Sequence, residues 1–262
     1  MTWIYAYPAW LFMLSAVVFG CALAVGALAV TRTKLTRNEL ITHNDVAGPI
    51  LSTIGTVLAV LMSFMVVGVW QEYDASARTV QEEASALADL HHLADLLPPP
   101  DRGALHSVVD RYITEVLFDE WPRMKHGGES LRAHDTAYSV QRVVAAFVPK
   151  MSRGVALQTE GLQLATRFLD ARRERLHDNT QGIPLILWVT LLFTGAVTVV
   201  FSFYFRVEHA AAQYVMVIAM TAVIMIIFAL TAELDYPFRG DFAVKPAPFV
   251  HTYDTVHGII SP

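Results

Sequence analysis

The sequence predicts an all-α membrane protein with four membrane-spanning helices and a helical bundle in water. Four apolar runs of 22 to 25 residues carry no charged side chain, and an uncharged run of this length is a candidate transmembrane helix. Only 16% of the residues are charged and the mean hydropathy is +0.42, whereas soluble domains average roughly 25% charged residues. The polar segment between the second and third runs has helical spacing and lacks the period-two pattern of strands.

Residues 9–30 form the first expected span. No Lys or Arg precedes this run, and it is longer than the ~7–15 apolar residues of a secretory signal, so we expect it to remain in the membrane. A basic connector follows at residues 31–45. Asn44 and Asp45, at the end of the connector, are candidate caps for the next helix.

The second span, residues 46–70, continues without a Gly or Pro break into polar residues 71–97. We therefore expect one long helix, half in lipid and half in water, which Pro98 and the two prolines after it would end. In the water half, apolar or small side chains alternate at spacings of four and three, which is typical of a seam for a neighbouring helix. The seam residues are Tyr73, Ala77, Val80, Ala84, Leu87, His91 and Ala94.

The soluble domain is expected at residues 71–182, with three further helices after the long one. The first of the three carries an amphipathic stripe and should end at Trp121-Pro122, with Trp121 buried. The other two are expected at residues 130–147 and 152–178. Together these helices predict a bundle.

Two more spans follow at residues 183–205 and 210–232, joined by a tight turn, and residues 233–262 form a Pro-rich tail. The first two spans fall within residues 1–70 and the last two within 183–232. Four spans place the domain and the tail on one side of the membrane. Six basic residues lie near the span ends on that side and four on the other, so the count favours a cytoplasmic domain.

Several function classes find no support in the sequence. The net charge of −5 and the lack of a basic cluster argue against a nucleic-acid partner. Cys21 is the single cysteine, which excludes an internal disulfide and a Cys-based zinc site. No nucleophile elbow, phosphate loop, dinucleotide fingerprint or zinc-protease motif is present, so we predict no catalytic residues, no metal and no cofactor.

Three motifs resemble a known family. They are FMVVGVWQEYDASAR at residues 64–78 with EEA at 82–84, DEWPRM at 119–124, and LDYPFRGDF at 234–242. Together they resemble a bacterial family of unknown function described as bestrophin-like, which is distantly similar to the bestrophin ion channels. The resemblance covers most of the chain and keeps the order of the spans.

The resemblance implies a homo-oligomer, usually a pentamer in bestrophins, in the bacterial inner membrane with its helical domain in the cytoplasm. It also implies a hydrophobic neck lined by the second span, where Phe64 matches the innermost position and Val60 and Thr56 precede it on the same face. The sequence departs from the bacterial bestrophin pattern after Phe64, because Met65-Val66 stands in place of an Arg-Asn pair. The acidic calcium clasp of the animal channels has no counterpart.

Acidic side chains predominate on the water half of the long helix. They could form a solvated face, or an acidic vestibule that concentrates cations. We select Glu72 and Glu83 as the vestibule candidates. In the tail motif, Pro237 and Phe238 are expected to dock the tail on the domain, with Arg239 and Asp241 paired across the turn.

Two functions therefore remain open. The first is an oligomeric channel for small monovalent ions, assembled from copies of this chain in the lipid bilayer. The alternative is a non-conducting, membrane-anchored sensor or scaffold. The seam distinguishes them: packing of Tyr73, Val80 and Leu87 within one subunit favours the scaffold, whereas packing against symmetry mates favours the channel.

Overall fold

The computed structural model describes residue 5 and residues 7–34, 44–205 and 209–257, and for residues 44–46 it describes the backbone alone. Every regular element in these ranges is a helix, and four helices are long and apolar enough to cross a membrane. The predicted fold class is confirmed. Arg37 of the connector, Arg206 of the tight turn and the capping side chains of Asn44 and Asp45 lie outside the described part.

The chain divides into two compact units, which we describe separately. The first unit comprises Met1–Gln71, Gly182–Asp235 and Gly240–Phe242, and the second comprises Glu72–Gln181, Tyr236–Arg239 and Ala243–Pro262. The long helix α2 (Asn44–Ala94) belongs to both units and has no break between them.

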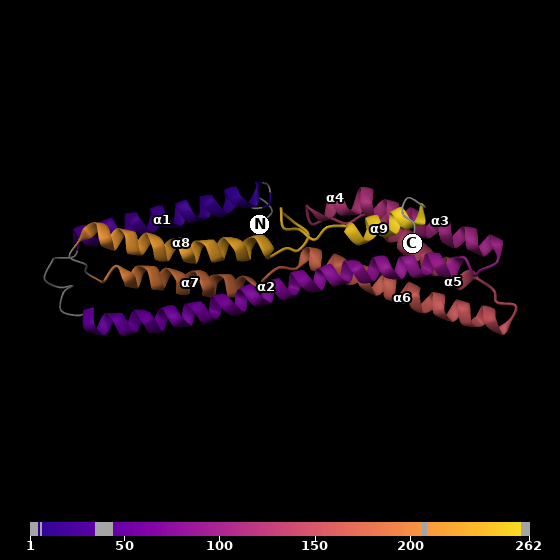
Figure 1. The fold of residues 1–262 in the computed structure, drawn as a ribbon, viewed down its shortest axis with the longest axis horizontal. Coiled ribbons are helices and arrows are strands. Elements are labelled where there is room, and N and C mark those ends of the chain that lie inside the picture. The colour runs from indigo at the N-terminus through magenta and orange to yellow at the C-terminus, as the bar shows by residue number, and fades with distance from the viewer. Residues whose placement is uncertain (1–4, 6, 35–43, 206–208, 258–262) are drawn as a thin grey trace. The chain divides into compact units, whose positions relative to one another are not determined.

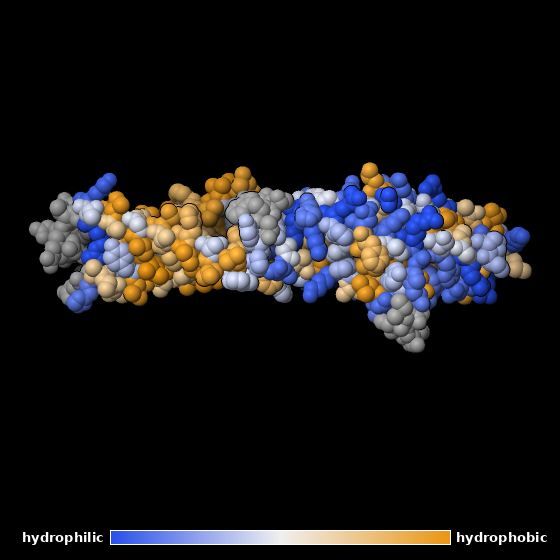
Figure 2. Space-filling model, turned by 90° about the horizontal axis from the view of Figure 1, so that it is seen from above, coloured by the Kyte–Doolittle hydropathy of each residue, from blue (hydrophilic) through white to orange (hydrophobic). Residues whose placement is uncertain are grey.

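The first unit contains the four candidate spans, which are α1 (Ala9–Lys34), the first part of α2, α7 (Leu185–Ser202) and α8 (Ala210–Leu234) (Figure 1). Helices α1 and α8 pack closely at Gly20 of α1. A side chain would not fit at this position, because its Cβ would lie 2.5 Å from Cγ of Met225. Arg32 donates a hydrogen bond to Oε1 of Gln213 at 2.9 Å, which also joins these two helices. Apolar side chains cover most of the visible face of this unit (Figure 2), as expected for contact with lipid.

The second unit is a helical bundle. Its elements are the second part of α2, α3 (Pro99–Glu115), the π-helical turn η3 (Val116–Glu120), α4 (Trp121–Met124), α5 (Leu131–Ala146), α6 (Ser152–Thr180) and α9 (Ala247–Val256). The seam of α2 faces this core: Val80 and Leu87 are fully buried and Tyr73 packs against the cluster. The seam is therefore occupied within one subunit.

The prediction that Pro122 ends a helix is wrong, because α3, η3 and α4 follow one another directly through Met124. A proline ring normally clashes with the carbonyl four residues earlier, here that of Phe118. The wider π-helical turn immediately before α4 offers the space that an α-helical turn lacks. Trp121 is buried as predicted, with its ring edge-on to Phe238 at a centroid distance of 5.8 Å.

A buried network of charges joins the helices of the second unit. Arg175 of α6 donates from Nε to Glu83 of α2 at 2.6 Å and from Nη2 to Glu120 of η3 at 2.7 Å. Arg172 also donates to Glu120, and the hydroxyl of Tyr112 donates to Glu83. Two guanidinium groups thus balance two carboxylates in the core. Burial, followed by the Glu83 carboxylate, raises the pKa of Tyr112 well above its usual value, so the phenol stays neutral.

We predict that Arg175→Met destabilises the second unit by about 3–5 kcal/mol, because it leaves two buried carboxylates without their shared cation. The measurement is chemical unfolding of the purified protein in detergent, followed by circular dichroism. Arg173→Met is the matched control, since Arg173 lies on the same helix with an exposed side chain. Equal stabilities for the two variants would contradict the role given to Arg175.

Candidate functional site

Helix α2 is the element on which the candidate site is built. Its 51 residues extend roughly 76 Å at ~1.5 Å per residue, and a hydrocarbon core is only ~30 Å thick. The uncharged residues 46–70 are long enough to cross it, and the first charged side chain after them is Glu72. Residues 46–70 are therefore the candidate membrane-spanning segment of α2.

Within the first unit, the predicted neck residues lie on the exposed side of α2. Thr56 and Val60 are exposed, and Phe64 is 73% exposed, whereas Leu58 and Met62 on the opposite side are buried. The hydroxyl of Thr56 donates to the carbonyl oxygen of Ser52 at 2.8 Å, so its polar hydrogen is already satisfied by the helix. The row Thr56–Val60–Phe64 thus presents a largely apolar surface to lipid or to another subunit.

A second apolar surface of the first unit is a groove of about 850 Å³ between α2 and α8. On α2 it is lined by Gly55, Ala59 and Ser63, which recur every fourth residue, and on α8 by Val223 and Ile227 among others. Small side chains at this spacing let another apolar chain approach the helix closely.

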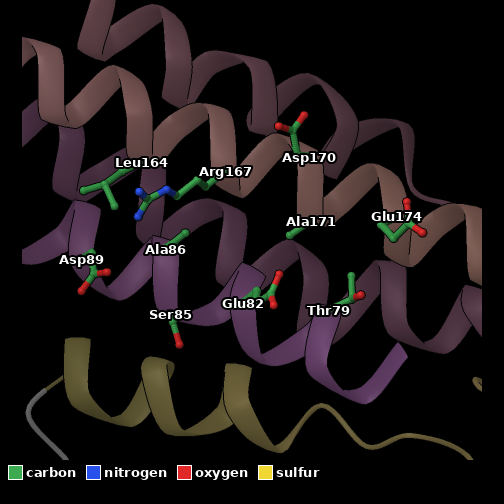
Figure 3. Close-up of a pocket in the computed structure, with 10 residues that line it drawn as sticks. All are labelled: Thr79, Glu82, Ser85, Ala86, Asp89, Leu164, Arg167, Asp170, Ala171 and Glu174. Atoms are coloured by element: carbon green, nitrogen blue, oxygen red, sulfur yellow. The ribbon is translucent and has the colours of Figure 1, made fainter. Parts of the chain in front are cut away.

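Within the second unit, an acidic groove of about 550 Å³ lies between α2 and α6 (Figure 3). Four carboxylates and one guanidinium group line it, and the floor is formed by Ala86, Ala171 and Leu164. The carboxylates are those of Glu82, Asp89, Asp170 and Glu174, and the cation is Arg167. The excess of carboxylates gives this surface a negative potential that would attract cations.

The spacing of the groove carboxylates along α2 can be compared with the position of Phe64 in the sequence. Glu82 is 18 residues after Phe64, which corresponds to five full turns of an α-helix, and Asp89 follows Glu82 by about two turns. In an ideal helix this spacing would give Phe64, Glu82 and Asp89 one common face. This spacing was available in the sequence, but the partner residues on α6 were not.

The prediction that Glu83 lines a vestibule is wrong. Its side chain is fully buried and both carboxylate oxygens accept hydrogen bonds from Arg175. Glu72 is exposed, as a vestibule residue must be, but ten residues separate it from Glu82, which turns it about 80° away around the helix. Glu82 and Asp89 are the α2 carboxylates that the acidic groove contains.

The tail motif connects to both units. Phe238 is 2% exposed and belongs to the core of the second unit, and Pro237 is also buried. The expected pair between Arg239 and Asp241 is wrong: Arg239 donates to the carbonyl oxygen of Asn179 at 2.9 Å, and Asp241 accepts from the backbone N–H of Ala9 at 2.8 Å. Gly240, between them, has φ of +77°, which redirects the chain.

Two carboxylates near the tail motif bind backbone N–H groups in the first unit. Asp241 binds the first residue of α1, and Asp235 accepts from Ile183, two residues before α7, at 2.6 Å. Negative charge at these helix starts complements the helix dipole. Among the described residues, no group of three or more His, Cys, Asp or Glu side chains is placed to hold a metal ion.

A family model described as Bestrophin-like domain matches residues 18–249, which is most of the chain. The chain belongs to the Bestrophin-like family. The resemblance found in the sequence motifs is therefore confirmed. A search of curated proteins found no match to this Bestrophin-like chain.

Solved structures share the fold of this Bestrophin-like protein. Two single-residue variants of a bacterial bestrophin homologue from Klebsiella pneumoniae align with TM-scores of 0.72 and 0.71, each at 10% identity over 94% of this chain and 98% of the other. A crystal structure described as a membrane protein aligns with a TM-score of 0.65 at 10% identity, with the same coverage. At this identity the likeness concerns the fold alone.

We predict that Phe238→Ala destabilises the second unit by about 3–5 kcal/mol, since it opens a cavity beside Trp121 in the core. Phe242→Ala is the matched control, because Phe242 belongs to the same motif but is 46% exposed. The measurement is again chemical unfolding in detergent. A loss in the Phe238 variant no larger than that in the control would show that Phe238 does not anchor the tail.

Proposed function

We propose that this Bestrophin-like protein is a homo-oligomeric channel for small monovalent ions. The observations that carry the proposal are two exposed surfaces of α2, an apolar row in the first unit and one wall of an acidic groove in the second. When several copies surround an axis with these surfaces inward, the same helix supplies first a hydrophobic neck and then a charged vestibule. Family membership and the shared fold support this arrangement.

The neck would consist of rings of Thr56, Val60 and Phe64. Apolar rings can stop ion flow by dewetting, without a charged gate. Phe64 is the largest of the three and is more exposed than Val60, so its ring would narrow the pore most. Glu72, the first charged residue after the uncharged segment, follows Phe64 by about two helical turns, so the neck would end close to the membrane surface.

The vestibule would be lined by Glu82 and Asp89 of α2 together with Asp170 and Glu174 of α6, with Glu72 beside them. Each copy adds an excess of carboxylates, and a ring of copies multiplies it. This favours cations over anions. The uncharged Met65-Val66 pair after Phe64 adds no positive charge that would oppose them.

We further propose that the assembly is a pentamer in the bacterial inner membrane with the second unit in the cytoplasm. Similarity to bestrophins supports the pentamer. The larger number of basic residues near the span ends on the domain side supports the orientation.

A non-conducting scaffold remains the second candidate, and one observation favours it. Val80 and Leu87 of the α2 seam are buried within a single subunit, so the seam does not join copies. Particle images of the purified protein in detergent separate the two: a ring of copies with α2 at its axis supports the channel, and a lone subunit excludes it.

We predict that Phe64→Ala raises the single-channel conductance, because it widens the narrowest ring and weakens dewetting. The measurement is current across a planar bilayer that contains the purified protein. Phe193→Ala is the matched control, since Phe193 on α7 is equally apolar and 68% exposed but lies outside the proposed pore. Unchanged current in the Phe64 variant would remove it from the pore.

We predict that the double variant Glu82→Gln/Asp89→Asn lowers the cation preference, because it removes two negative charges per copy from the vestibule. The reversal potential in a salt gradient should move toward zero. Glu160→Gln is the control, since Glu160 is exposed on α6 but does not line the acidic groove. If the double variant keeps the wild-type reversal potential, the groove does not face the ion path.

A further inference from the structure

The end of α2 and the start of α3 are joined by two histidines in direct contact. Nε2 of His91 lies 2.7 Å from Nδ1 of His106, and the two ring centroids are 4.0 Å apart. The other ring nitrogen of His106, Nε2, lies 3.2 Å from Oδ1 of Asp95. His91 belongs to α2, Asp95 directly follows the end of α2, and His106 belongs to α3. All three side chains lie beyond the membrane-spanning segment.

Titratable side chains surround this pair. They lie on α2 and α3 and directly after the ends of α2 and α9. On α2 this is His92, whose ring centroid lies 6.1 Å from that of His91, and Asp95 directly follows the end of α2. On α3, Asp110 is one turn after His106 and also acts on His91. His257, next to α9, approaches Asp110 with 3.2 Å between Nε2 and Oδ1, without the geometry of a hydrogen bond. The pair is thus faced by two carboxylates and two further imidazoles.

The 2.7 Å contact exists only while one of the two facing nitrogens lacks a proton. Two neutral rings satisfy the site when Nε2–H of His91 donates to Nδ1 of His106 and Nε2–H of His106 donates to Asp95. A His106 that carries both hydrogens also satisfies it, since it then donates to His91 and to Asp95. A further proton on Nε2 of His91 would point two N–H groups at each other and add a second positive charge. The hydrogen bond would then be lost.

The surroundings of His91 oppose that further proton. Burial and then the neighbouring His106 lower the pKa of His91 below its ordinary value, although Asp95 and Asp110 act in the opposite direction. A group whose pKa is lower in the folded state stabilises it fully above the ordinary histidine pKa of about 6.5. This stabilisation is lost as the pH falls from there toward the lowered value.

We propose that the His91–His106 pair is a pH-sensitive contact that holds the end of α2 to α3 at neutral pH and opens on acidification. Opening frees the water-side end of the helix that carries Phe64. It also releases His106 from the Asp95 site, so the first turns of α3 loosen. The proposal holds whether or not the protein conducts ions, because it concerns the second unit alone.

The test is hydrogen exchange of the full-length protein in detergent at pH 7.5 and pH 5.0, analysed as protection factors that remove the intrinsic pH dependence. Peptides that cover residues 88–110 should lose protection by about three- to tenfold at the lower pH, the effect of one lost hydrogen bond. His91→Gln should remove this loss, since the Gln oxygen accepts from His106 and does not titrate. His134→Gln, exposed on α5, is the control and should leave the loss intact.

Two results would overturn the proposal. One is wild-type protection at residues 88–110 that does not change with pH, and the other is a change that persists in His91→Gln. Direct titration of the His91 ring by NMR in the wild-type protein keeps the question decidable if the variant does not fold. The proton must enter His91 over the pH range in which protection falls, and a mismatch between the two ranges excludes the contact as the cause.

Discussion

The uninterrupted backbone of α2 is the constraint on which the rest of the structure depends. In lipid every backbone N–H and carbonyl group must find its partner within the protein, and a helix satisfies this requirement by itself. Because α2 continues past residue 70 without a break, the same helix supplies the exposed apolar row of the first unit and one wall of the acidic groove of the second.

The buried charge network fixes how the water-side part of α2 is turned within the second unit. Arg175 binds Glu83 through two hydrogen bonds in the core of the second unit, so this face of α2 must point inward. Glu82, the residue before Glu83, is then turned about 100° away around the helix and lines the groove. A buried ion pair is weak evidence for net stability, but breaking one is costly. Loss of either partner would therefore leave an uncompensated charge in the core of the second unit.

Much of the fold could be predicted because the membrane leaves a plain signal. The four spans follow from uncharged runs, the long helix from the lack of Gly or Pro, and the buried seam from its spacing. The vestibule could not be predicted at residue level, because Glu82 and Glu83 are neighbours with the same chemistry. What separates them is Arg175, 92 residues away. The prediction that Arg239 pairs with Asp241 is wrong for a similar reason, since both side chains bind backbone groups that are distant in sequence.

The closed seam restricts how copies of this chain can meet, but it does not prevent assembly. In a closed ring each copy presents two different surfaces, one to each neighbour. The seam is excluded, so these surfaces must be drawn from exposed faces. In the first unit the candidates are the Thr56–Val60–Phe64 row and the apolar groove between α2 and α8. In the second unit Leu131, Val148 and Met151 are highly exposed, and apolar side chains in water mark a contact surface when they gather together. A scaffold needs none of these surfaces to enclose an axis, whereas a channel requires the α2 row to do so.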